Sequence, residues 1–182
     1  MLKNMTSILK LRGAAALSTS RLERLSRAAG EVLPRLAGLA AEHWYFVELQ
    51  DALDADERAR LVDMLDAHPA SAAQPAGTLR LVVPRLGTIS PWSSKATDIA
   101  HQCGFDKIVR IERGIAYSIN ARGVEGNAAL IALLHDRMTE SVLSSLDEAE
   151  ALFHHYEPQP LTTVDILVGG RAALEKANGE LG

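Results

Sequence analysis

Apolar and polar positions follow a strand-like pattern at three places in the first half of the chain. Residues 7–12 alternate between apolar and polar side chains, residues 42–49 (EHWYFVEL) are rich in aromatic and branched residues, and residues 78–84 (TLRLVVP) form an apolar run stopped by a proline. Strand side chains point alternately to the two faces of a sheet, and aromatic and β-branched residues suit a pleated surface. We therefore predict a strand at each of the three.

Between these strands the apolar spacing changes to that of helices. Ser20 with Glu23, and Asp54 with Glu57, are spaced as capping boxes, in which each of the two side chains accepts a bond from the other residue's backbone amide. Each pair precedes apolar residues at intervals of three or four. Two helices are predicted, and the inner faces are Leu22, Leu25, Ala29 and Val32 in the first, and Leu61, Met64 and Leu65 in the second.

The second half of the chain continues the same mixture. Residues 96–103 predict a helix ended by Gly104, and residues 107–119 predict two short strands on either side of Gly114. A further helix, a strand over residues 140–145 and a short helix capped by Asp147 with Glu150 complete the pattern. The further helix is marked by Leu130, Ile131, Leu134 and Met138.

Strands intermixed with helices predict an α+β fold, a mainly antiparallel sheet with helices packed on it. The character of the sequence changes at Glu157, where EPQPLTT has two prolines and no apolar pattern. We predict one domain over residues 1–156. Residues 157–182 are predicted to begin a linker, with a helix near Arg171, that leads to a region absent from this chain.

Composition narrows the classes of function. The chain has 182 residues, 47% of them apolar and 23% charged, with a net charge of −4, which argues against a nucleic-acid-binding protein. Lys10 and Arg12 interrupt the N-terminal apolar stretch below the length of a signal peptide, and no apolar run is long enough for a membrane helix. A single cysteine excludes a disulfide framework. We expect a cytoplasmic location, with neither nucleic acid nor membrane as a partner.

The sequence shows no familiar catalytic pattern. Phosphate-binding glycine loops, the dinucleotide fingerprint and the nucleophile elbow of hydrolases are missing. Cys103 is predicted to be a buried core residue, because His101 lies about 200° away around a helix and cannot activate it. His154 and His155 suggest a metal site, with Glu150 one helical turn before His154, but two ligands do not fill a tetrahedral zinc site and the sequence offers no obvious others. We therefore interpret these residues as a solvated helix end. No catalytic residue and no metal ligand is predicted.

The most unusual stretch is residues 87–99, GTISPWSSKATDI, which holds one of the two tryptophans, a lysine and five hydroxyl side chains. Pro91 disfavours helix at Ser90, so a helix should begin with Ser93 or Ser94 as its N-cap. Three interpretations remain open. Trp92 packs beneath a capped helix, or the hydroxyls and helix amides hold an anion, or the segment contacts another domain. The candidate residues are Thr88, Ser90, Trp92, Ser93, Ser94 and Lys95.

PRLGTISPWSSKATDIAHQCG (residues 84–104) followed by IVRIERGIAYSI (108–119) closely resembles the N-terminal part of the large bacterial phosphoribosylformylglycinamidine synthase, or formylglycinamide ribonucleotide amidotransferase. The similarity extends to LRGAAALS, LHDRMTESV, LDEAEALF and TTVDIL, and so covers nearly the whole chain. TISPWSSKATDIAH is the most specific of these motifs.

The resemblance implies a role in purine biosynthesis. Enzymes of this family use ATP, Mg²⁺ and glutamine to convert formylglycinamide ribonucleotide to the amidine, and they consist of an N-terminal domain, a linker, a synthetase region and a glutaminase domain. The N-terminal domain resembles a fused pair of the small structural subunit of multi-subunit forms. None of the ATP, Mg²⁺ or glutaminase motifs matches a position here, so no cofactor and no activity is expected for this chain alone.

The resemblance favours a contact with other domains for residues 88–95. We expect these residues to face the synthetase region and to help seal the path of ammonia from the glutaminase domain. A free-standing module that binds an anion or another small molecule through Thr88–Lys95 is the alternative.

Overall fold

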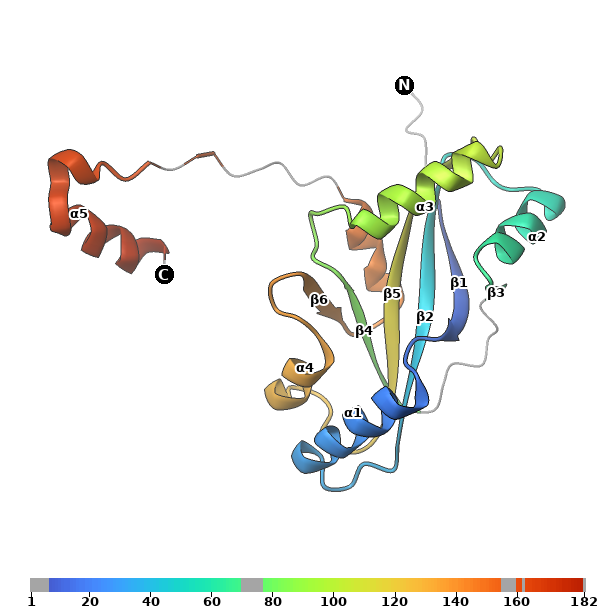
Figure 1. Ribbon diagram of the computed structural model, residues 1–182, viewed down its shortest axis with the longest axis horizontal. Coiled ribbons are helices and arrows are strands. Elements are labelled where there is room, and N and C mark those ends of the chain that lie inside the picture. The colour runs from blue at the N-terminus through green and yellow to red at the C-terminus, as the bar shows by residue number, and fades with distance from the viewer. Residues whose placement is uncertain (1–6, 70–76, 155–159, 162, 182) are drawn as a thin grey trace.

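The computed structural model describes residues 7–69, 77–154, 160, 161 and 163–181. In this part of the chain, six strands form one antiparallel sheet in the order β3-β1-β2-β5-β4-β6, and all the helices except the last one pack around it (Figure 1). The predicted α+β class is confirmed. The strands are β1 (Ser7–Ala15), β2 (Gly38–Leu49), β3 (His68–Pro69), β4 (Thr78–Pro84), β5 (Ile108–Asn120) and β6 (Glu140–Leu143). The helices are α1 (Thr19–Val32), α2 (Ala55–Met64), α3 (Pro91–Gln102), α4 (Ala128–Leu134), the 3₁₀ helix η1 (Asp147–Phe153) and α5 (Ile166–Leu181).

The centre of the sheet is the pairing of β2 with β5, which runs from Gly38 opposite Asn120 to Leu49 opposite Ile108. The prediction of two strands separated at Gly114 is wrong, because β5 continues through this glycine. Gly114 is instead a point of close approach between strands. A β-carbon there would lie 2.9 Å from the Val82 carbonyl oxygen and 3.0 Å from Val83 Cγ1.

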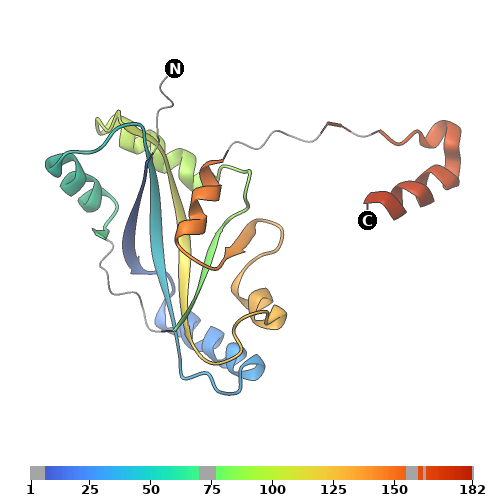
Figure 2. The same cartoon turned by 180° about the vertical axis from the view of Figure 1, so that it is seen from behind.

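The helices cover one face of the sheet at its two ends. Near α2 and α3, a buried cluster includes Tyr45, Leu61 and Ile111, and near α1 and α4 a second cluster includes Ala29, Tyr117 and Leu130. The opposite face carries a third cluster with η1 (Figure 2). The predicted inner faces of α1 and α2 are confirmed, since their residues belong to the first two clusters.

The N-terminus of α2 confirms its predicted capping box. The Glu57 amide donates to Asp54 Oδ1 at 2.8 Å, and the Asp54 amide donates to Glu57 Oε2 at 2.8 Å. The corresponding prediction for the first helix is wrong. Ser18 is its N-cap, in extended conformation and without a side-chain cap bond, so Ser20 lies inside the first turn.

Other boundaries in the second half also differ from the prediction. Helix α4 ends at Leu134 and leaves Met138 in the following turn. The short helix before His154 is 3₁₀, and its N-cap is Leu146 rather than Asp147. A strand at 140–145 is confirmed as the shorter β6. In α5 a backbone break at Gly170, with φ of 54°, separates the first residues from a longer segment that begins at Arg171.

Both views place α5 apart from the sheet (Figures 1 and 2). Within the described residues, no helix combines the length and the apolar character that a membrane span requires. The proposed boundary at residue 156 stays a prediction.

Replacing Gly114 by alanine should destabilise the domain by about 1–3 kcal/mol, because the new methyl group meets backbone and side chain of β4. Gly30→Ala in α1 is the matched control. Nothing lies within 4 Å of its would-be β-carbon, so this change should stabilise by about 0.5–1 kcal/mol. Urea unfolding of both variants measures the two effects. Equal stability of Gly114→Ala and the wild type would show that β4 and β5 are not in such close contact.

Candidate functional site

The candidate residues, Thr88–Lys95, extend from the loop after β4 into the first turns of α3. We call them the candidate segment. Strand β4 pairs with β5 only as far as Val82 opposite Ile115, so the earlier residues of β5 lack a β4 partner. Helix α3 lies against this part of β5. The Ile111 amide donates to Thr97 Oγ1 at 3.0 Å, and Thr97 is buried. The Thr97 hydroxyl thus accepts the hydrogen bond from β5 that a neighbouring strand would otherwise accept.

Helix α3 begins earlier than predicted. Ser90 is the N-cap, Pro91 is the first helical residue, and the Ser93 amide donates to Ser90 Oγ at 3.0 Å. The prediction of Ser93 or Ser94 as the N-cap is wrong. A proline restricts the residue before it to extended conformations, and an N-cap residue is already extended, so proline fits the first helical position.

Most hydroxyls of the segment bond within the domain. Thr88 Oγ1 donates to the Arg85 carbonyl oxygen at 2.6 Å, and Ser90 Oγ both caps α3 and donates to Glu112 Oε2 at 3.3 Å. Ser93 is fully buried, which leaves its hydroxyl no surface for another domain. Ser94 and Lys95 are exposed. The structure therefore does not gather the candidate hydroxyls around one anion.

Trp92 is half-buried and has features both of a core residue beneath a helix and of a residue that contacts another domain. Its ring stacks on Tyr45, with centroids 5.9 Å apart and an interplanar angle of 24°. The Arg113 guanidinium lies 4.6 Å from the Trp92 ring centroid, a cation–π distance. The indole packs against the cluster near α2 and α3. Trp92 is thus held by the core, yet part of it remains at the surface.

Below the N-terminus of α3 lies a buried carboxyl that sequence reasoning missed. Glu112 is fully buried, and the Nε atom of Arg110 is 3.8 Å from its Oε1. Arg110 also donates to the Leu152 carbonyl oxygen and lies over the Phe153 ring. Burial raises the pKa of Glu112 above its usual range, and Ser93, Arg110 and Ser90 lower it by less. This carboxyl supports the start of α3 from inside the domain.

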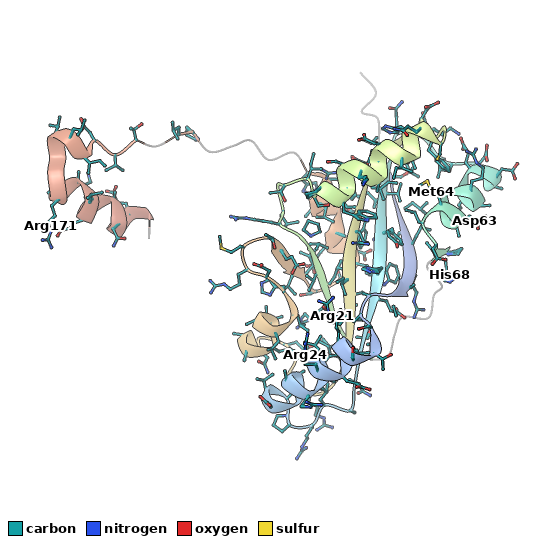
Figure 3. The ribbon with its side chains drawn as sticks, in the orientation of Figure 1. Arg21, Arg24, Asp63, Met64, His68 and Arg171 are labelled. Carbon is teal, nitrogen blue, oxygen red and sulfur yellow. The ribbon has the colours of Figure 1, made fainter. Side chains whose placement is uncertain are left out.

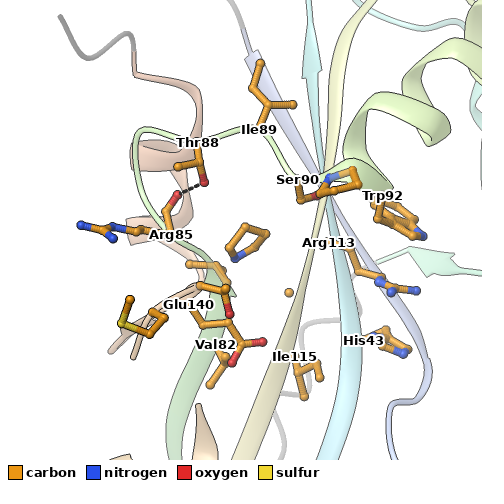
Figure 4. Close-up of a pocket in the computed structure, with 16 residues that line it drawn as sticks. His43, Val82, Arg85, Thr88, Ile89, Ser90, Trp92, Arg113, Ile115 and Glu140 are labelled. Carbon is orange, nitrogen blue, oxygen red and sulfur yellow. Dashed lines mark hydrogen bonds between the residues drawn. The ribbon is translucent and has the colours of Figure 1, made fainter. Parts of the chain in front are cut away.

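An open groove of about 510 Å³ lies beside the candidate segment, on the face of the sheet that carries the helices. We call it the sheet groove. Val82 and Ile115 form its floor (Figure 4), and Gly114 also lines it. Thr88, Ile89 and Ser90 line its upper edge, Arg85 and Glu140 one side, and His43, Trp92 and Arg113 the other. Burial, and next the charge of Arg113, lower the pKa of His43, which favours a neutral imidazole.

A smaller hollow of about 190 Å³ lies on the other side of Trp92, between α2 and α3. Met64, Leu65, Lys95 and Ile99 contribute to it. Trp92 therefore borders both hollows. Apolar side chains and one or more cations line each of the two hollows.

The remaining candidates do not join these hollows. The prediction of a buried Cys103 is wrong: this residue is exposed and forms the C-cap of α3, because the inward position of the last turn is occupied by Ala100. His101 Nε2 bonds with the Ile108 carbonyl oxygen at 2.7 Å rather than with the cysteine.

The cluster predicted to be a solvated helix end lies at the end of η1. His154 is the C-cap of η1 and is exposed, as is Glu150, and His155 lies outside the described residues. Among the residues that the structure describes, no three His, Cys, Asp or Glu side chains gather as a metal site.

A comparison with protein families decides which kind of domain carries this site. The family model for the N-terminal domain of formylglycinamide ribonucleotide amidotransferase matches residues 42–153, more than half of the chain. The chain belongs to this family. The match begins in β2 and ends with η1, so it includes the sheet groove, Trp92 and Glu112. The resemblance noted in the sequence is thereby confirmed for the domain.

Trp92→Ala should lower the free energy of unfolding by about 2–3 kcal/mol, since the variant loses one stacked pair, one cation–π contact and part of its buried area. Trp44, which is only 4% exposed, is the matched control. Trp44→Ala should cost about 3–5 kcal/mol, as for aromatic residues in cores. Iodide should quench the fluorescence of Trp92 in a Trp44→Phe background more strongly than that of Trp44 in a Trp92→Phe background. A shielded Trp92 with the full core cost would make it a purely structural residue.

Glu112→Gln should gain stability relative to the wild type as the pH rises. A carboxyl whose pKa is raised in the folded state binds its proton more tightly there. The contribution of this carboxyl to the free energy of unfolding is therefore complete below its pKa in the unfolded chain, about 4.3. The contribution is lost as the pH rises through the pKa of the carboxyl in the folded state. Glutamine does not titrate. Urea unfolding at pH 4.5 and pH 8 should show a larger advantage of the variant at pH 8. A difference that shrinks with pH would mean that the Arg110 charge outweighs burial.

Proposed function

We propose that this chain is an assembly domain of formylglycinamide ribonucleotide amidotransferase and packs on the synthetase region of that enzyme. The observation that carries the proposal is the family match over residues 42–153. The geometry supports it, because Trp92 is anchored by Tyr45 and Arg113 and still borders two surface hollows. Partly exposed tryptophans of this kind are common at the centres of protein interfaces.

In this proposal the candidate residues divide into two groups. Thr88, Trp92, Ser94 and Lys95 offer surface to the neighbouring region, whereas Ser90 and Ser93 hold the segment in place from inside. Exposed apolar side chains extend the contact, since Ile89 is 59% exposed beside Thr88. The free-standing anion module has less support, because the hydroxyls it requires are bonded within the domain.

The domain contributes to the reaction indirectly. Ammonia released from glutamine must reach the synthetase site before bulk water protonates it, and close packing between domains keeps water out. ATP and Mg²⁺ belong to the synthetase region in this proposal. The described residues of this chain do not fit a metal site, so no step of that chemistry is assigned to it.

The test uses the synthetase and glutaminase regions prepared as one protein without this domain. The chain alone should form no amidine from formylglycinamide ribonucleotide, ATP and glutamine. Added to the prepared regions, it should restore glutamine-dependent amidine formation more strongly than formation from added ammonia, because only the first needs a sealed path. Turnover by the purified chain alone, or no effect of adding it, would contradict the proposal.

A further inference from the structure

The sheet groove continues from the candidate segment towards α1 and α4. It shares Val82, Ile115 and Glu140 with a second hollow of about 420 Å³ that lies against α1 and α4. Arg21 and Arg24 of α1 line this part, and Figure 3 shows where they lie on the helix. Because they share these lining residues, the two hollows adjoin over the sheet, one beside the start of α3 and the other against α1 and α4. We call the two together the extended groove.

The extended groove is cationic although the chain is acidic. Arg21, Arg24, Arg85 and Arg113 line it, and the ion pairs found among the described residues include none of the four. The net charge of the chain is −4. Four arginines on one channel therefore run against the overall charge.

The carboxylates that line the extended groove are bound to backbone amides of the turn before β6. Glu140 Oε2 accepts from the Asp136 amide at 2.8 Å, and Asp136 Oδ1 accepts from the Met138 amide at 2.7 Å. These bonds fix the two carboxylates in the turn. Arg21, Arg24 and Arg85 have no ion-pair partner among the described residues and can meet a binding partner, whereas Arg113 also lies over the Trp92 ring.

The rim of the extended groove is apolar. Met138 is 75% exposed, Leu133 is 40% exposed and Ile89 is 59% exposed, and all three line the extended groove. Val82 and Ile115 form the floor. Exposed apolar side chains around a hollow with polar anchors are typical of surfaces that bind another protein.

We propose that the extended groove is the docking site for an acidic polypeptide segment with apolar side chains, supplied by the synthetase region of the same enzyme. This proposal rests on the proposed function and names the surface and the partner's chemistry. The arginines select carboxylates, and the apolar rim and floor accept neighbouring apolar side chains. A small ligand fits less well, because small-molecule pockets enclose most of the ligand surface, whereas this channel is open and spans the sheet from α3 to α1.

The test replaces two arginines whose side chains form no ion pair and no cation–π contact among the described residues. Arg24→Glu with Arg85→Glu reverses charge in both halves of the extended groove, and both side chains are exposed. Arg35→Glu with Arg58→Glu makes the same change in net charge at exposed positions outside it. Binding of each chain to the prepared synthetase and glutaminase regions is measured by calorimetry at low and high salt, with thermal unfolding to verify folding.

The groove variant should bind at least tenfold more weakly than the wild type, and the control should stay within about twofold. Wild-type binding should weaken as salt is added, because salt screens the arginines, and the groove variant should lose most of this dependence. Arg24→Gln with Arg85→Gln replaces the charge reversal if that variant does not fold, and the same ordering is expected. Equal binding by groove variant and control would overturn the groove proposal alone. Failure of the wild-type chain to bind would overturn the proposed function, and the groove proposal with it.

Discussion

The antiparallel pairing of β2 with β5 is the constraint on which the other features depend. Its register sets Tyr45 opposite Arg113 and Phe46 opposite Glu112. The first pair faces the helices and holds Trp92, and Glu112 turns toward the start of α3. Because successive strand residues alternate between faces, a shift of one residue would exchange the buried carboxyl with the stacking arginine. The same register therefore determines both the core and the candidate surface.

The early departure of β4 from β5 explains why the candidate segment is rich in hydroxyls. Beyond Val82 the edge of β5 needs other partners, since a buried amide without a hydrogen bond is costly. The Thr97 hydroxyl accepts a hydrogen bond from the Ile111 amide, and the Ser90 hydroxyl, which caps α3, donates a hydrogen bond to Glu112. The hydroxyls that look like ligand-binding groups in the sequence thus replace a missing strand. What remains for a partner is the indole, the apolar rim and the cations.

Local patterns predicted local structure well and long-range placement poorly. The three early strands, the inner faces of α1 and α2 and the Asp54 cap depend on residues close in sequence, so spacing revealed them. The continuity of β5 through Gly114 depends on β2, a strand distant in sequence that pairs with β5 on both sides of this glycine. His43, Glu112 and Arg113 entered the site only through register, and nothing in their spacing marks them. Trp92 was found because an aromatic residue among hydroxyls is unusual in itself.

The distribution of charge suggests how the surface achieves specificity. An acidic domain repels acidic partners over most of its surface, so four arginines in one channel restrict their approach to that channel. Such complementarity contributes more to orientation and to the rate of association than to affinity. In the proposed docking, affinity is assigned to Trp92 and the apolar rim, which line the same groove as Arg85 and Arg113. The proposed assembly role would benefit from this division, because the charges would orient the partner and the indole would stabilise the docked position.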